Sequence, residues 1–210
     1  AAEAALETSL QRNSTDVSDL SFDGIASINA QLITDTSATF TTPLIQKDGQ
    51  YTFFPSPYDE SSEAISSTPY SGEITITTSM PNPSTYCTGD DTKFALELTF
   101  IDSSTTPPTS VRRLIDDCDI VEGTEHEWDF GTSYNLASED IASTIFFMKV
   151  ITQSSNFEGA KIVVSRSTGT WPLQGKTLIS TAKTTTGVEK KIKLFQSYPQ
   201  IPSDLFVTSF

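Results

Sequence analysis

Residues 93–101 read KFALELTFI, and this stretch decides the fold class that we expect. Four large apolar side chains occupy its alternate positions: Phe94, Leu96, Leu98 and Phe100. Alternate positions share one face of an extended strand. We therefore expect residues 93–101 to form a central strand of an apolar core.

Short β-branched or aromatic runs continue in both directions from this strand. They cover residues 28–33, 51–54, 73–78, 111–115, 144–152, 160–165, 176–181 and 190–196. Turn residues separate them, which is typical of an antiparallel β-sandwich. Residues 144–151 are apolar on both faces and should be buried on both. One short internal helix is expected over residues 135–142, with Ser138 as its N-cap.

The N-terminal segment differs from the rest, because residues 1–12 read AAEAALETSLQR and consist mostly of strong helix formers. Ala2, Leu6 and Leu10 lie at four-residue spacing and form one face. A helix of about a dozen residues is marginal in water by itself. We therefore expect residues 1–16 to be the end of a longer helix, and residues 17–210 to form the globular β-sandwich domain.

Composition excludes some function classes. The formal net charge is −14 and the pI is near 4.3, which argues against nucleic-acid binding, because phosphate contacts require clustered Lys and Arg. Ser and Thr make up more than a quarter of the residues, a composition common in secreted surface proteins. The sequence contains no apolar run long enough to span a bilayer, which takes roughly 18 residues or more.

The chain contains two cysteines, Cys87 and Cys118. A disulfide between them is the expected state, because it would close a loop of about thirty residues and stabilise the fold by roughly 3–4 kcal/mol. Two separate reduced thiols in the core are the alternative. A zinc site is disfavoured, since the spacing matches no zinc-ligand pattern.

Motifs for chemistry are sparse. Asp116, Asp117 and Asp119 are a candidate Ca²⁺ site. The alternative is that they mark the end of a strand that turns into solvent. The acidic loop 58–63 is a weaker candidate for a Ca²⁺ site. No nucleophile-elbow sequence accompanies the single histidine, His126, and no glycine-rich phosphate loop is present. We therefore expect no enzymatic activity, no cofactor and no resident metal, although paired carboxylates of the glycosidase type meet only in the fold.

Four aromatic residues are candidates for a sugar-stacking surface: Trp128, Tyr134, Trp171 and Tyr198. Scattered aromatic residues in a β-sandwich belong more often to the core or its rim.

The ends of the chain resemble the type IV pilin-like proteins, specifically the PilX-type pilus-assembly or minor pilin proteins. Residues 1–7, AAEAALE, are similar to the A-A-E-[AS]-G-[IL]-E sequence where that family's hydrophobic helix leaves the membrane. Residues 178–181 (LIST) and 187–194 (GVEKKIKL) resemble the two closing strands of the family, and 197–202 (SYPQIP) its S-x-P-x-[LI]-P tail. More loosely, residues 111–118 resemble a strand that ends at a family cysteine.

The resemblance implies a structural subunit of a type IV pilus or pseudopilus, located at the cell surface and anchored in the membrane before assembly by an apolar helix upstream of Ala1. Its partners would be other pilin subunits and the assembly machinery, with Ala2, Leu6 and Leu10 as the face of the assembly helix; any surface ligand is unknown. The alternative is a secreted carbohydrate-binding or adhesive β-sandwich module, for which the helix would be a linker.

Overall fold

The computed structural model describes residues 1–34, 36–79, 87, 92–121 and 127–201. Within these residues the chain is mainly β, with one α-helix at its start and antiparallel strands after it. In chain order the elements are α1 (Ala2–Arg12), β1 (Ile25–Ile33), β2 (Thr39–Thr41), β3 (Gln50–Phe53), β4 (Tyr58–Asp59), β5 (Ala64–Ile65), β6 (Glu73–Thr78), β7 (Ala95–Asp102), β8 (Thr109–Ile115), β9 (Ser133–Asn135), β10 (Ile145–Ile151), β11 (Ile162–Arg166), β12 (Gly175–Thr184) and β13 (Glu189–Ser197).

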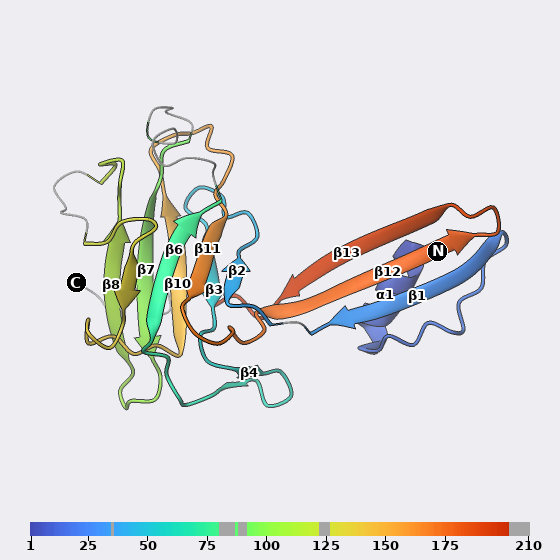
Figure 1. Ribbon diagram of the computed structural model, residues 1–210, viewed down its shortest axis with the longest axis horizontal. Coiled ribbons are helices and arrows are strands. Elements are labelled where there is room, and N and C mark those ends of the chain that lie inside the picture. The colour runs from blue at the N-terminus through green and yellow to red at the C-terminus, as the bar shows by residue number, and fades with distance from the viewer. Residues whose placement is uncertain (35, 80–86, 88–91, 122–126, 202–210) are drawn as a thin grey trace. The chain divides into compact units, whose positions relative to one another are not determined.

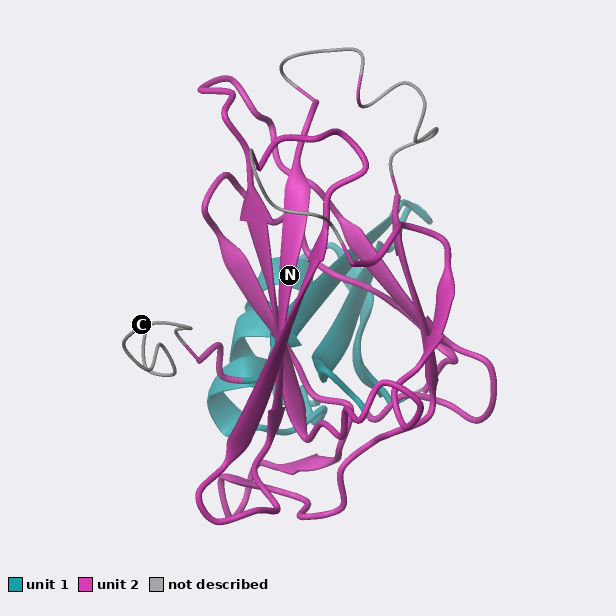
Figure 2. Cartoon of the chain, turned by 90° about the vertical axis from the view of Figure 1, so that its left-hand side faces the viewer, with its two compact units in different colours: residues 1–35, 173–198 teal, residues 36–172, 199–210 magenta. Residues whose placement is uncertain are grey.

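The chain divides into two compact units. Unit 1 combines residues 1–35 with residues 173–198, and unit 2 comprises residues 36–172 and 199–210 (Figure 2). Unit 2 is therefore inserted into unit 1 between β1 and β12. The boundary expected after residue 16 falls inside unit 1.

Unit 1 is a helix on a three-stranded antiparallel sheet of order β1-β12-β13. Ile33 of β1 pairs with Thr177 of β12, so residues far apart in sequence form one ladder. β12 and β13 form a hairpin whose turn includes Gly187 at φ 91°, a left-handed conformation that suits glycine. α1 packs along the strands of this sheet (Figure 1).

Unit 2 contains two four-stranded antiparallel sheets, ordered β3-β10-β7-β8 and β2-β11-β6-β9, which stack face to face (Figure 1). A separate two-stranded ladder joins β4 and β5. The expected β-sandwich is confirmed. β7 lies between β10 and β8. The alternating side chains Leu96, Leu98 and Phe100 of β7, and Phe94 just before it, are fully buried, as the sequence predicts.

β10 is the second central strand of this sheet. Residues on both of its faces are buried, including Phe146 on one face and Phe147 on the other, which confirms the expectation for residues 144–151. β3 borders β10 on one side, and the segment around Ile201 lies along β3. The Thr52 hydroxyl accepts the Ile201 N–H at 3.0 Å, and Gln200 Oε1 accepts the Thr52 N–H at 2.7 Å.

The internal helix expected over residues 135–142 does not form, and consecutive turns take its place. The Asn135 side chain accepts the N–H groups of Ala137 (3.1 Å) and Ser138 (3.4 Å), which is the geometry of an Asx-turn. Asp140 then adopts a left-handed φ of 54°, which a right-handed helix does not allow. A side chain that binds nearby backbone amides thus replaces the helical ladder.

Candidate functional site

α1 docks on the unit 1 sheet through small side chains. Ala2, Ala5 and Ser9 are 3%, 0% and 2% exposed, and their spacing places them on one stripe of the helix. Of the expected face of Ala2, Leu6 and Leu10, only Ala2 is fully buried; the two leucines are half-buried on the flank of the stripe. The packing residues are small because small side chains let the helix backbone approach the sheet closely.

The side of the sheet that faces α1 also carries small side chains. Ala30 of β1 packs with Ala5 and Val17 in the apolar core of unit 1. On the same side of β12 lie Ser180 and Ala182, both buried. Neither the Ser9 nor the Ser180 hydroxyl has a hydrogen-bond partner in this structure.

Polar contacts fix both ends of α1 on the sheet. Near its start, Lys190 of β13 donates to Glu3 at 2.8 Å, and this bond and charge hold the pKa of Glu3 below its usual value. At its end, Asn13 adopts the left-handed conformation, and its side chain accepts a bond from Lys176 of β12 at 3.0 Å. Arg12, the last residue of α1, forms a bidentate ion pair with Asp19 at 2.9 and 2.8 Å.

These contacts determine the direction of α1 along unit 1. Lys190 lies near the β12–β13 turn, whereas Lys176 pairs with Gln196 at the other end of the sheet. The chain leaves unit 1 after Ile33, returns at Gly175 and leaves again after Ser197, and all three positions lie at this second end. α1 therefore starts at the end of the sheet opposite to the three connections with unit 2.

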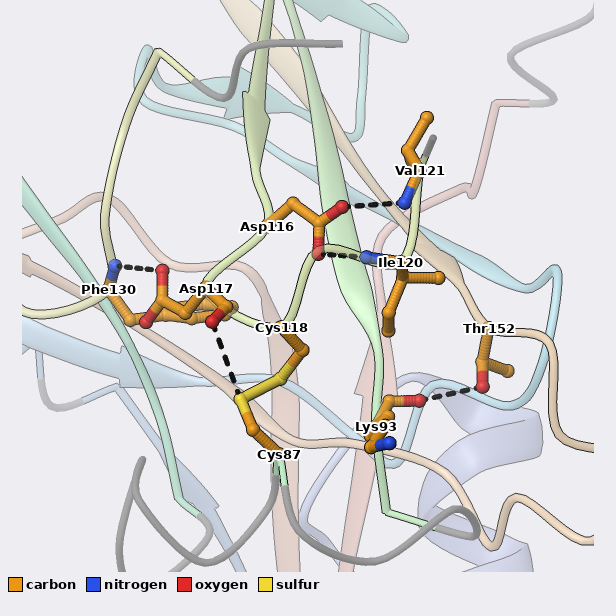
Figure 3. The surroundings of a disulfide bond; sticks show 9 residues. All are labelled: Cys87, Lys93, Asp116, Asp117, Cys118, Ile120, Val121, Phe130 and Thr152. Atoms are coloured by element: carbon orange, nitrogen blue, oxygen red, sulfur yellow. Dashed lines mark hydrogen bonds between the residues drawn. A yellow bond between two sulfur atoms is a disulfide. The ribbon is translucent and has the colours of Figure 1, made fainter. Parts of the chain in front are cut away.

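Cys87 and Cys118 form a disulfide, as expected, with an S–S distance of 2.01 Å and a sequence separation of 31 (Figure 3). Cys118 lies in the turn after β8. The Cys87 sulfur lies 3.6 Å from the Asp117 carbonyl oxygen, a contact rather than a hydrogen bond because a disulfide sulfur carries no proton. The disulfide ties Cys87 to this turn.

The turn after β8 uses its acidic side chains internally. Asp116 is 2% exposed, and its carboxylate accepts the N–H groups of Ile120 at 2.9 Å and Val121 at 2.7 Å (Figure 3). Asp117 points elsewhere and accepts the Phe130 N–H at 3.4 Å, while Asp119 is exposed. The candidate Ca²⁺ ligands are thus not gathered around one point. No cluster of three acidic, histidine or cysteine side chains suited to a metal occurs among the described residues.

The acidic loop 58–63 is similarly organised around one aspartate. The Asp59 carboxylate accepts bonds from the backbone and hydroxyl of Ser61 and from the hydroxyl of Ser62, at 2.7–2.9 Å. These bonds stabilise the charged form and lower the pKa of Asp59 to about 2. The loop is therefore a serine-capped turn.

The aromatic residues proposed for sugar stacking lie mostly in the core. Trp128 and Trp171 are 1% and 2% exposed, and the Trp171 indole donates to the Val164 carbonyl at 3.1 Å. Tyr134 stacks on Trp128 with a centroid distance of 4.1 Å, and Tyr198 is a half-buried residue of unit 1. Neither tryptophan ring is available to stack on a sugar.

The buried carboxylates among the described residues accept hydrogen bonds from nearby backbone N–H groups. Two described carboxylates are largely buried: Asp116 holds its own turn, and Asp102 accepts the Ser104 N–H at 2.8 Å. The single histidine, His126, lies outside the described residues.

Sequence reasoning missed the turn-forming role of Asp116 and the docking role of Ser9. The Asp-Asp-Cys-Asp run carries a signal for the first, since aspartate favours Asx-turns. No sequence pattern indicates the docking role of Ser9, because a serine inside an Ala-rich helix is expected to face solvent.

Comparison of the chain with protein-family models, curated proteins and solved structures found no match. Within the described residues, no helix has the length and hydropathy needed to cross a bilayer.

Proposed function

We propose that this chain is the extracellular part of a pilin-like subunit of a type IV pilus or pseudopilus, with a minor or assembly role. α1 would be the end of an apolar helix that begins upstream of Ala1. That helix would anchor the subunit in the membrane and afterwards pack against neighbouring helices in the filament.

The observation that carries the proposal is the placement of α1 in unit 1. The helix starts at the end of the sheet opposite to the three connections with unit 2. A segment continuing upstream from Ala1 would therefore leave unit 1 at the end remote from those connections. The docked stripe of Ala2, Ala5 and Ser9 would transmit the position of the upstream helix to the sheet.

Exposed apolar side chains at that end support the same interpretation. Phe22 and Val188 are 40% and 66% exposed. Both lie at the end where α1 starts, because Thr185 in the β12–β13 turn donates to Gly24 at 3.0 Å. Beside an upstream membrane helix, these two apolar side chains would rest at the lipid interface.

The remaining features suit an extracellular position. The Cys87–Cys118 disulfide is a bond that persists in oxidising compartments. Unit 2 carries seven Lys or Arg and twenty Asp or Glu, a formal net charge of −13, whereas unit 1 carries six and seven, a net charge of −1. The acidic unit 2 would face water and neighbouring subunits, and the nearly neutral unit 1 would lie next to the membrane helix.

The test uses the full-length gene product in its own host. We expect the protein in the membrane fraction before assembly, and in sheared surface filaments afterwards. The double variant Phe22→Ser with Val188→Ser should lower the yield of filaments, while Leu44→Ser, which changes an exposed leucine of unit 2, should not. A full-length protein found only as a secreted, filament-free monomer would overturn the proposal.

A further inference from the structure

A pocket of about 340 Å³ lies in unit 1 where α1 ends above the sheet. Asn13 ends the helix in the left-handed conformation, so the chain turns away before it covers the last residues of the strands. Leu32 lies on the helix side of β1 opposite Leu178, yet it is 38% exposed for this reason. The volume falls in the range of small-molecule sites, roughly 300–1,000 Å³.

The apolar part of the pocket consists of three leucines: Leu10 of α1, Leu32 of β1 and Leu178 of β12. They come from three different elements, so an aliphatic group placed among them would be covered from several sides. Burial of each CH₂ group in such a place should strengthen binding by about fourfold.

Charge selects the kind of ligand. Of the described residues that line the pocket, only Lys176 is ionisable, and its bond to Asn13 Oδ1 at 3.0 Å holds the ammonium group at the wall. The helix C-terminus contributes an opposing partial negative charge, but the N–H groups of Asn13 and Ser14 already occupy the carbonyls of Leu10 and Ser9. The full charge of Lys176 therefore dominates and favours an anion.

We propose that this pocket binds a small aliphatic monocarboxylate. The carboxylate would lie against the Lys176 ammonium, and the aliphatic chain would lie among Leu10, Leu32 and Leu178. This site does not depend on the proposed pilin-like function.

The test is a titration of the ¹⁵N-labelled chain followed by two-dimensional NMR, with hexanoate as the probe. We expect saturable shifts of the amide signals around Ser9, Leu32 and Lys176. Acetate lacks the aliphatic chain, and hexylamine carries the opposite charge, so both should bind at least tenfold more weakly. Equal binding of hexanoate and hexylamine, or shifts without saturation, would overturn the proposal.

Variants test the contact of the carboxylate with Lys176. Lys176→Met should weaken hexanoate binding by about tenfold or more and abolish its preference over hexanol, because a hydrogen bond to a charged group is lost. Lys183→Met removes a lysine from the same strand outside the pocket and is the matched control. If Lys183→Met weakens binding as much as Lys176→Met, the attraction is only the general charge of unit 1 and the site is refuted.

Discussion

The two units of this chain differ in how their cores are filled. The largest fully buried side chains all belong to unit 2 and are mostly aromatic, and the Phe146 ring contacts the rings of both Phe53 and Phe100. Unit 1 instead packs α1 on its sheet through alanines and serines. Large side chains bury more apolar area each, so unit 2 should be the more stable part. Close packing of small residues fixes the position of α1 in unit 1 but buries little apolar area per residue.

The difference can be measured, because both tryptophans lie in unit 2. Tryptophan fluorescence therefore reports the unfolding of unit 2, whereas amide hydrogen exchange in β1 and β12 reports unit 1. The expected effects below run from the largest to the smallest.

The largest effect should come from the aromatic core. Phe146→Ala removes a ring that lies 4.7 Å from Phe53 and 5.1 Å from Phe100, centroid to centroid. We expect it to lower the free energy of unfolding of unit 2 by about 3–5 kcal/mol. Denaturant titration followed by fluorescence measures this change. A loss below about 1 kcal/mol would mean that the interior collapses around the gap and does not depend on this ring.

The second-largest effect should come from removal of the disulfide. The double variant Cys87→Ser with Cys118→Ser removes the bond between two positions that are 31 residues apart in sequence. In the chain-entropy model the closed loop is worth about 3–4 kcal/mol. The same fluorescence titration should therefore show a lower midpoint, and the oxidised and reduced wild-type chains should differ by a similar amount. Equal stability of the oxidised and reduced chains would contradict a stabilising role.

Asp116→Ala tests the turn after β8. Its loss leaves the N–H groups of Ile120 and Val121 without the carboxylate that accepts them, which we expect to cost about 2–3 kcal/mol in the stability of unit 2. Asp116→Asn keeps one acceptor oxygen and should recover part of the loss. Asp119→Asn is the control, since that side chain is exposed and asparagine tolerates its left-handed conformation. A loss in the control as large as that in Asp116→Ala would refute the role of the Asp116 carboxylate.

Ala5→Leu tests the close packing of unit 1. Ala5 is 0% exposed against the sheet, so a larger side chain should force α1 away and destabilise unit 1 by roughly 1–3 kcal/mol. Hydrogen exchange in β1 and β12 should accelerate, while the fluorescence transition of unit 2 stays in place. Glu7→Leu, on the exposed side of α1, should leave both unchanged. Unchanged exchange in Ala5→Leu would show that α1 is not held by this stripe.

The smallest effect should come from the Glu3–Lys190 pair. The pKa of Glu3 is lowered from 4.5, first by its hydrogen bond to Lys190 and then by the charge of Lys190. A carboxylate with a lowered pKa stabilises the folded state above its unfolded-state pKa, and that contribution disappears as the pH falls through the folded-state value. The small stability difference between wild type and Glu3→Gln in unit 1 should therefore be present at pH 7 and vanish in acid. A difference that grows on acidification would contradict this pairing.

Sequence patterns predicted the long strands well, because β-branched and aromatic alternation is a local signal. Residues 73–78 form β6 with the predicted bounds, and β7 and β10 are central as expected. The short strands β2, β4, β5 and β9 were missed, since two or three residues carry too little pattern. The internal helix failed because the Asn135 side chain binds the backbone of the following turn, a competition that residue propensities do not resolve.

The insertion of unit 2 into unit 1 could not be predicted from the sequence. β1 pairs with β12 across more than a hundred residues, and nothing in either strand identifies the other as its partner. The docking stripe was assigned to Ala2, Leu6 and Leu10 because of their four-residue spacing. The alanine and serine of the sheet opposite let α1 approach closely, and small residues of α1 form the contact instead. The disulfide was predictable because the chain has two cysteines.

The central claim is that α1 is the end of a longer apolar helix that unit 1 carries at one end of its sheet. The most direct measurement is the sequence immediately upstream of Ala1 in the full-length protein. The account predicts a basic leader, a Gly or Ala cleavage site, and then an apolar run of about 20 residues in continuous helical phase with Ala2 and Ala5. A polar or Pro-rich segment directly before Ala1 would contradict it.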